Sequence, residues 1–184
     1  MRSMRIRELT DADLDAVAEL RVHSWRFAYA GLMPEEHLAA LSPKRDAQRR
    51  REMRAASDGT VTDLVAEDAG GEIAGMAAFG PYRTGATAGD AQLAGDGELY
   101  ALYVRPELVG GGFGRELFTA CVRRLAAGGH PRLRLWVLRE NLRARGFYAH
   151  MGCAADGAET VCDVAGAQVP EVRYVRPLGE RAAQ

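Results

Sequence analysis

The fold is decided by residues 98–114, which read ELYALYVRPELVGGGFG. Residues 98–104 have the composition of a β-strand, and Pro106 ends that strand. Glycines follow at 110–112, and from Phe113 onward apolar side chains return at helical spacing. A glycine turn between a strand and a helix presents backbone N–H groups beside the positive end of the helix dipole, where they can surround a phosphate. The stretch therefore predicts an anionic, nucleotide-like ligand.

Two common phosphate-binding loops do not match this glycine run. A P-loop has a lysine directly after its last glycine, whereas the only lysine of this chain is Lys44. A dinucleotide fingerprint would place glycine at position 115 or 117, where the chain has Arg115 and Leu117. A tight turn without any ligand would also use glycines. The remaining ligand is a diphosphate carried by something other than a P-loop nucleotide or a Rossmann cofactor.

The rest of the chain supplies the elements around this stretch. Strands are expected at residues 4–9, 62–67, 73–79, 98–104, 132–138, 161–164 and 172–175. Helices are expected from Thr10, from Glu35, over 43–56 with a solvated arginine-rich face, from Phe113 to Gly128, and from Asn141 to about 151–152. Residues 68–72 form a hairpin turn, and residues 81–97 are interpreted as a long mobile loop. The order strand, helix, strand over 98–138 implies a parallel crossover.

Composition narrows the classes of function. The chain has 184 residues, and its 24 Lys and Arg against 25 Asp and Glu leave a net charge of -1. This balance gives no basic excess for nucleic acid or an anionic membrane surface, so neither partner is expected. The 3 cysteines lack the spacings of a disulfide scaffold or a zinc site, and no metal is expected. Residues 1–8 alternate charged and apolar side chains, which argues against a signal peptide and favours a cytoplasmic protein.

Three segments together resemble the acetyl-CoA-binding core of the GNAT superfamily of N-acetyltransferases: residues 98–106, Gly112-Phe113-Gly114, and residues 140–152, which read ENLRARGFYAHMG. The resemblance implies an α/β fold with a single GNAT-like domain over residues 1–184. Its mixed central sheet would have about seven strands, antiparallel in the N-terminal part, with a parallel crossover splayed at the cofactor cleft and helices on both sides. The expected parts are an acceptor-side region over 1–97, an acetyl-CoA-binding core over 98–153, a closing hairpin over 154–178 and a frayed tail over 179–184.

The resemblance also implies which residues hold acetyl-CoA. The family loop reads Gln/Arg-x-x-Gly-x-Gly/Ala, and Gly112 and Gly114 take its glycine positions, while Val109 stands at the Gln/Arg position. Because such a loop works through backbone N–H groups, we expect a reshaped but working cradle. The expected cofactor-binding residues are Leu102, Tyr103, Val104, Val109, Gly110, Gly111, Gly112, Phe113, Gly114, Arg115 and Asn141.

Two side chains are expected to carry the chemistry. A lysine-like amine with a pKa of about 10.4 is protonated at pH 7, so a general base helps to present it neutral. The resemblance places Glu98 as that base and the Tyr148 hydroxyl as the acid that protonates the departing thiolate. Alternatives stay open: a solvated edge carboxylate for Glu98, a water relay or Asp96 as the base, and aromatic packing for Tyr148. Asn141 can also serve simply as a helix cap.

The sequence says less about the acceptor and the attacking group than about the acetyl-CoA site. Cys121 lies on the apolar stripe of its helix and is interpreted as a structural thiol, which favours direct attack in a ternary complex. Trp25, Tyr29 and Met33 are the candidate acceptor-binding residues. The expected acceptor is a primary amine of a small molecule or peptide, and a homodimer is possible. The main alternative is a non-catalytic acyl-CoA-binding sensor, which Val109 favours and Glu98, Asn141 and Tyr148 disfavour.

Overall fold

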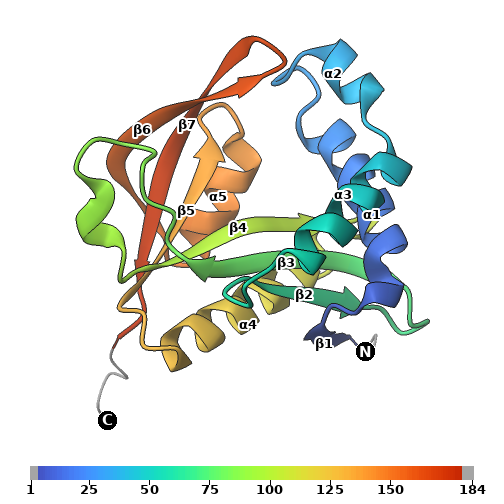
Figure 1. Ribbon diagram of the computed structural model, residues 1–184, viewed down its shortest axis with the longest axis horizontal. Helices are drawn as coiled ribbons and strands as arrows, with labels where there is room; N and C mark the ends of the chain where they lie inside the picture. The colour runs from blue at the N-terminus through green and yellow to red at the C-terminus, as the bar shows by residue number, and fades with distance from the viewer. Residues whose placement is uncertain (1–3, 180–184) are drawn as a thin grey trace.

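The structure, a computed structural model, describes residues 4–179 and contains one mixed sheet of seven strands (Figure 1). The strand order is β1-β2-β3-β4-β5-β7-β6. The strands are β1 (Arg5–Glu8), β2 (Thr62–Glu67), β3 (Ile73–Pro81), β4 (Gly97–Val104), β5 (Arg132–Leu138), β6 (Ala154–Val164) and β7 (Ala167–Pro177). All neighbouring pairs are antiparallel except β4 and β5, which run parallel. The seven-stranded mixed sheet expected from the sequence is confirmed. Of the tail expected over 179–184, the residues after Gly179 lie outside the described part of the chain.

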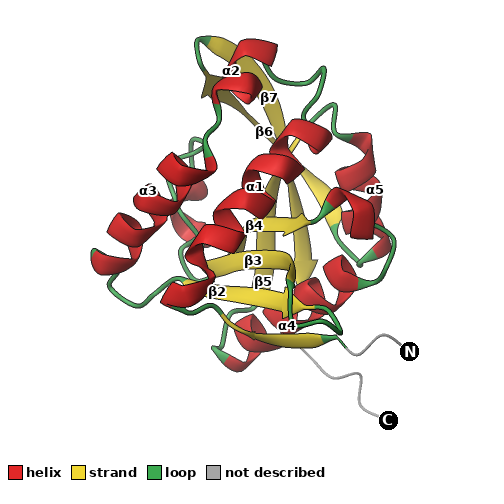
Figure 2. Ribbon diagram, turned by 90° about the vertical axis from the view of Figure 1, so that its right-hand side faces the viewer, coloured by secondary structure: helices red, strands yellow, loops and turns green. Residues whose placement is uncertain are grey.

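Helices cover both faces of the sheet (Figure 2). They are α1 (Leu14–Ala28), α2 (Glu35–Ala40), α3 (Pro43–Ala55), α4 (Phe113–Ala127) and α5 (Leu142–His150). Single 3-10 turns occur at η1 (Asp11–Asp13), η2 (Asp90–Leu93) and η3 (Pro106–Leu108). The helix boundaries follow local signals, since Ser42 and Asn141 accept hydrogen bonds from backbone N–H groups at the starts of α3 and α5.

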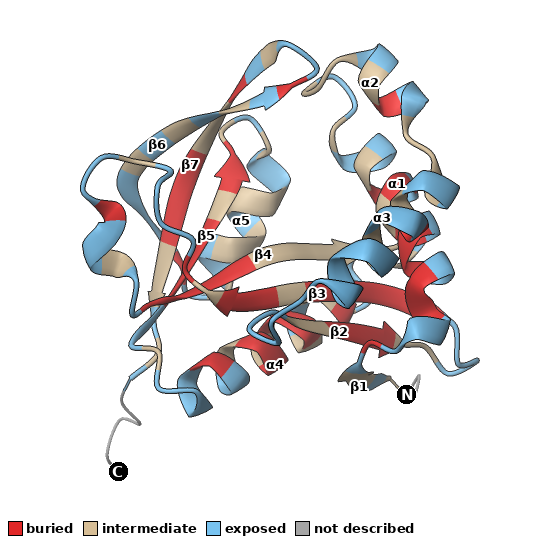
Figure 3. Ribbon diagram, in the orientation of Figure 1, coloured by how far each residue is buried: buried red, intermediate tan, exposed pale blue. Residues whose placement is uncertain are grey.

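Two apolar cores form because strand side chains alternate between the faces of the sheet. On β2, Leu64 and Ala66 belong to the core under α4, whereas Val65 belongs to the core under α1. The α4 stripe contributes Leu117, Phe118, Cys121 and Leu125 to the larger of these cores. Figure 3 shows this burial concentrated in the central strands and the inward sides of α1 and α4. The expected structural role of Cys121 fits this position, and burial raises the pKa of its thiol to about 12.

The sheet opens where β4 leaves β5. Their register contains Gly97 opposite Leu133 and Glu98 opposite Arg134, and beyond these pairs the two strands diverge (Figure 1). Gly97 lets α4 approach closely, since a Cβ at this position would lie 2.6 Å from a methyl group of Leu125. The facing edges of β4 and β5 therefore carry backbone groups that no neighbouring strand pairs.

The segment between β3 and β4 is more ordered than its composition suggested. It contains η2, and the buried Asp90 carboxylate accepts hydrogen bonds from the N–H groups of Gly85, Ala86 and Thr87. Asp96 is also buried and binds Arg134 of β5 at 2.6 Å. Two carboxylates thus organise a stretch whose glycines and alanines gave no periodic signal.

Candidate active site

A cleft of about 640 Å³ lies where β4 and β5 diverge. This volume is in the range of small-molecule sites in proteins. β4, the glycine turn after η3, β5 and α5 provide most of its lining, and the end of α1 and one residue of β7 complete it. The expected gap between the strands is therefore present.

One end of the cleft is the glycine turn before α4. Gly110 and Gly112 have φ values of 87° and 91°, a left-handed conformation that strains residues with a Cβ. Gly112 is the N-cap of α4, so the N–H groups of Phe113, Gly114 and Arg115 begin the helix without intrahelical acceptors. The helix dipole adds positive potential at this point.

The turn has the properties needed to bind a diphosphate. Gly110, Gly112 and Gly114 line the cleft together with the side chains of Arg115 and Arg143. A Cβ at Gly110 would meet no protein atom within 4 Å, so the space beside this glycine is open. The pyrophosphate of acetyl-CoA fits this set of donors, which combines helix N–H groups with the guanidinium of Arg115.

Most of the residues predicted to bind acetyl-CoA line this cleft. They are Leu102, Tyr103, Val104, Val109, Gly110, Gly112, Gly114, Arg115 and Asn141. The two others lie outside its lining, because the Gly111 N–H donates to the Leu108 carbonyl and Phe113 packs in the core. Gly111 and Phe113 instead border a second hollow, which shares Val109 and Gly110 with the cleft.

Tyr148 of α5 lines the cleft, and two phenylalanine rings pack against its own ring. The ring packs against Phe118 and Phe147 at centroid distances of 6.0 and 5.3 Å. Burial raises the pKa of its hydroxyl above the ordinary value, so the hydroxyl keeps its proton at neutral pH. Asn141 lines the same cleft while its side chain accepts a hydrogen bond from the Ala144 N–H at 3.1 Å. Packing and capping therefore coexist with access to the cleft.

Glu98, the expected general base, does not lie at a solvated edge, which was the alternative interpretation. Its side chain is 2% exposed and lies outside the cleft lining. Arg83 donates three hydrogen bonds to the carboxylate, from its backbone N–H at 2.8 Å, its guanidinium Nη2 at 2.9 Å and its Nε at 3.4 Å. The guanidinium also stacks on the ring of Tyr100, 4.2 Å from its centroid. Asp96, the other candidate base, is held by Arg134.

The segment predicted to bind the acceptor meets the tip of the β6–β7 hairpin (Figure 1). Tyr29 lines the cleft, and Trp25 packs against Tyr29 edge-on with ring centroids 5.0 Å apart. Met33 packs, with Tyr29, on the cluster formed by Leu138, Val164 and Val169. Tyr29 thus reaches the cleft, whereas Trp25 and Met33 lie outside its lining and support this wall.

The comparisons with known proteins agree with this geometry. The family model described as "Acetyltransferase (GNAT) family" matches residues 15–153. The chain belongs to the GNAT acetyltransferase family. "Uncharacterized N-acetyltransferase YuaI" of Bacillus subtilis (strain 168) is 31% identical over 138 residues, which cover 74% of this chain and 72% of the relative. A spermidine N(1)-acetyltransferase of Thermoplasma acidophilum is 24% identical over 150 residues, covering 82% and 88%.

Solved structures share the fold of this GNAT protein. The PaiA N-acetyltransferase from Thermoplasma acidophilum in complex with coenzyme A superposes with a TM-score of 0.71 at 20% identity, over 95% of this chain and 99% of that one. Family membership makes the GNAT protein an acetyl-CoA-dependent acyltransferase. Within residues 4–179, no helix is both long and apolar enough to cross a membrane, and no group of three or more metal-binding side chains comes together.

Sequence reasoning missed several residues of this GNAT cleft. Glu171 lines it from β7, opposite Leu138 in the register, and burial raises the pKa of its carboxyl. Arg143 lines it from α5, with its guanidinium carbon 5.5 Å from the ring centroid of Phe27. Ser24 of α1 lines it as well and donates a hydrogen bond to the Val104 carbonyl at 3.0 Å. The alternation around 172–175 was visible in the sequence, but the proximity of β7 to the cleft depends on a strand order that no local signal encodes.

Proposed function

We propose that this acetyltransferase moves an acetyl group from acetyl-CoA to a primary amine of a small molecule or peptide by direct attack in a ternary complex. The observation that carries the proposal is the arrangement of three features in one cleft. A diphosphate cradle lies at the glycine turn, a proton-donating tyrosine faces the cleft from α5, and a carboxylate lines it from β7. This order suits a long donor whose thioester meets an amine near the tyrosine.

The donor side uses backbone groups more than side chains. The N–H groups at the start of α4 and the guanidinium of Arg115 hold the pyrophosphate. The unpaired edge of β4 from Leu102 to Val104 orients the pantetheine arm, and acetyl-CoA supplies the thioester. Val109 is 40% exposed beside the turn and offers no polar group to the phosphates. The cradle therefore depends on the main chain.

Tyr148 is the proposed general acid. Its hydroxyl stays protonated because burial raises its pKa, and it faces the cleft where the thiolate must leave. Protonating the thiolate prevents the reverse attack on the new amide. A well-placed acid contributes roughly 10² to 10⁴ in rate.

The acceptor has to lose a proton before it attacks. Glu98 is the predicted base, yet Arg83 binds its carboxylate, so direct proton transfer to Glu98 requires that Arg83 release it or that water relay the proton. A cationic amine suits the carboxylate of Glu171, which lines the cleft, and the spermidine acetyltransferase among the relatives supports an amine acceptor. Residues 1–184 acting as one domain, a cytoplasmic location and a homodimer stay predictions.

The function is tested by thiol release from acetyl-CoA with a panel of amines. Suitable acceptors are spermidine, free amino acids and peptides with a free N-terminus. We expect acetyl-CoA to bind in the absence of amine and thiol to appear with at least one acceptor. Binding of acetyl-CoA without thiol release from any amine would favour the sensor alternative.

The Tyr148→Phe variant tests the proposed acid. We expect kcat to fall by about 10²-fold or more, because the thiolate loses its proton donor, while the affinity for acetyl-CoA changes little. Steady-state kinetics and calorimetric binding of acetyl-CoA separate these effects. Tyr174→Phe is the matched control, since this buried tyrosine of β7 lies outside the cleft lining and pairs with Arg145. Equal losses of kcat in both variants would contradict the assignment.

A further inference from the structure

The acceptor end of the cleft contains a carboxylate that the mechanism above leaves unused. Among residues 4–179, Glu171 is the acidic side chain that lines the cleft. It lies on β7 between Leu138 of β5 and Thr160 of β6. No hydrogen bond within the described part of the chain engages its carboxylate, which is half-buried and faces the cleft. This carboxylate is therefore free to bind a ligand.

Few charged groups lie near the Glu171 carboxylate, and the nearby cation already has a partner. Arg83, from the segment after β3, is the cation near enough to lower its pKa, and Glu98 of β4 raises it. Arg83 is already engaged by Glu98 through two short hydrogen bonds and by the ring of Tyr100. Burial is the largest effect on Glu171 and leaves its pKa raised. A carboxylate in this state gains from a cation and is a stronger base than an exposed one.

The neutral groups around Glu171 connect it to the proposed acid. Glu171 and Tyr148 both lie close enough to the Tyr29 hydroxyl to raise its pKa, as does Tyr103. Burial also raises the pKa of Tyr29 and Tyr148, so both hydroxyls stay neutral. The wall between Glu171 and the proposed acid thus contains aromatic rings and hydroxyl groups. Arg21 is close enough to lower the pKa of Tyr29, but its guanidinium is already paired with Asp46 and lies over the ring of Trp25.

We propose that Glu171 binds the ammonium group of the acceptor and accepts its proton, while Glu98 acts as a positioning residue that holds Arg83. This assignment rests on the proposed function and names the acceptor as a cationic amine. The two neighbouring carboxylates then have different partners. Arg83 neutralises Glu98, and the ammonium group of the substrate neutralises Glu171.

The protons balance in this scheme. The ammonium gives one proton to Glu171, and the lone pair of nitrogen forms a bond with the thioester carbon. The bond from carbon to sulfur breaks with its electron pair on sulfur, which takes the proton of the Tyr148 hydroxyl. The second proton of the nitrogen returns to Tyr148 through solvent, and Glu171 releases its proton to solvent. The net reaction yields an amide, a thiol and one proton.

The test compares two kinds of amine in the Glu171→Gln variant of the full chain. One is the best alkylamine of the panel, which is cationic at pH 7, and the other is p-anisidine, an arylamine that is largely neutral. We expect kcat/KM for the alkylamine to fall by about 10² to 10³-fold and kcat/KM for p-anisidine to fall by less than about tenfold, since the neutral amine needs no base. Acetyl-CoA affinity, measured by calorimetry, stays unchanged.

The pH profile provides a second readout. Because Glu171 must be ionised to accept a proton, kcat/KM of the wild type for the alkylamine falls as the pH drops through its raised pKa. In Glu171→Gln the limb set by Glu171 disappears, and kcat/KM instead follows the fraction of neutral amine up to the pKa of the alkylamine, about 10.4. In Glu171→Asp the limb remains with partial activity. Glu159→Gln, which removes an exposed carboxylate on β6, is the control and keeps the wild-type profile.

The possible outcomes distinguish a failure of the role assigned to Glu171 from a failure of the proposed acetyltransferase function. Equal losses with both amines in Glu171→Gln, or an unchanged profile, would overturn the role of Glu171. A loss that is selective for the alkylamine in Glu98→Gln and absent in Glu171→Gln would return the base to Glu98. Wild-type protein that binds acetyl-CoA but releases no thiol with any amine would overturn the proposed function itself.

Discussion

At the scale of single residues, the Asp13 carboxylate connects the first strand to the first helix. It accepts hydrogen bonds from the backbone N–H of Thr10 at 2.7 Å and from two nitrogens of Arg7 at 2.7 and 2.9 Å. The Arg7 guanidinium is the largest influence holding the pKa of this carboxyl well below its usual range. The sequence predicted Thr10 as a cap, and the pairing of Asp13 with Arg7 adds a contact that crosses from β1 to η1.

The Asp13→Asn variant should lose stability in a way that depends on pH. Because the folded-state pKa is lowered, the ionised group stabilises the protein above the ordinary pKa of about 3.9, and that contribution vanishes as the pH falls through the folded value. We expect a loss of about 2 kcal/mol at pH 7 that shrinks under acidic conditions.

Urea unfolding at several pH values measures the effect of Asp13→Asn. Asp15→Asn is the control, because its side chain is 75% exposed and its pair with Arg51 lies on the surface. Such a pair contributes at most about 1 kcal/mol. A loss for Asp13→Asn that is independent of pH would contradict the role of its charge.

At the scale of elements, the two ends of α4 have glycines of similar conformation and different tasks. Gly112 begins the helix with φ of 91° at the cleft, and Gly129 follows its end with φ of 85° in open space. A Cβ in this region of φ costs roughly 1 to 2 kcal/mol at either position. The cradle for the diphosphate is built at one end alone.

We therefore expect Gly112→Ala and Gly129→Ala to lower the free energy of unfolding by similar amounts, and only Gly112→Ala to raise the KM for acetyl-CoA, by about tenfold. A methyl group at Gly112 turns the N–H groups of the cradle away from the phosphates. Thermal unfolding and steady-state kinetics give the two quantities. Similar changes in KM for both variants would show that the helix start does not hold the donor.

Elements with strong local signals were predicted closely from the sequence. The strand at residues 132–138 and the hairpin from Thr62 have the expected bounds within a few residues, because alternation and turn glycines act over short distances. The α4 stripe also buried the expected side chains, from Leu117 to Leu125. The closing hairpin lies within the expected residues 154–178, but its two strands are longer than the expected 161–164 and 172–175. The start of β6 was not recognised as a strand because its residues are polar and exposed and resemble a loop.

Only the parts of the site formed by contiguous stretches of sequence could be predicted. The glycine turn, Asn141 and Tyr148 lie in contiguous segments with recognisable spacing, and they meet in the cleft. The pairing of Glu98 with Arg83 and the access of Glu171 to the cleft are tertiary contacts between strands, and nothing in either local sequence indicates them. Carboxylates were visible as candidates, but their partners decide their chemistry.

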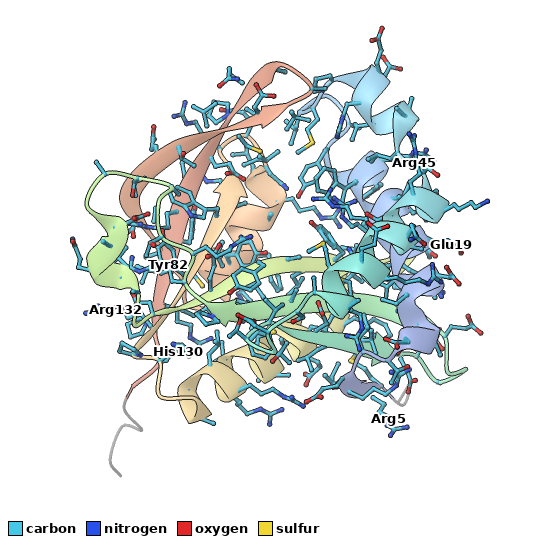
Figure 4. All side chains as sticks on the ribbon, viewed as in Figure 1. Arg5, Glu19, Arg45, Tyr82, His130 and Arg132 are labelled. Carbon is cyan, nitrogen blue, oxygen red and sulfur yellow. The ribbon has the colours of Figure 1, made fainter. Side chains whose placement is uncertain are left out.

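At the scale of the whole molecule, a buried network joins the segment before β4 to three strands. Arg134 binds Asp96 and Asp156, each at 2.6 Å, and Arg173 binds the same Asp156 at 2.7 Å. Arg173 also donates to the hydroxyl of Tyr82, which Figure 4 labels beside the segment that follows β3. Asp96 and Asp156 together thus balance the charges of two guanidinium groups that have little contact with water, and Asp156 binds both of them.

We expect Asp156→Asn to cost on the order of 3 kcal/mol, because it leaves buried positive charge without its partner. That cost corresponds to a fall in Tm of roughly 6 to 12 °C for a chain of this size. Hydrogen exchange in residues 81–96 should accelerate at the same time, since the network holds this segment. Glu159→Gln on the same strand removes an exposed pair and serves as the control. Unchanged exchange in residues 81–96 would contradict the anchoring role.

The divergence of β4 from β5 also affects how long the folded chain survives. Gly97 and Glu98 provide the register pairs that tether the two halves of the sheet directly. Acetyl-CoA bound along the open edges would add contacts between those halves. A ligand at 100 times its Kd stabilises the folded state by about 2.7 kcal/mol. The lifetime of the enzyme against unfolding and proteolysis then follows the supply of its own acyl donor.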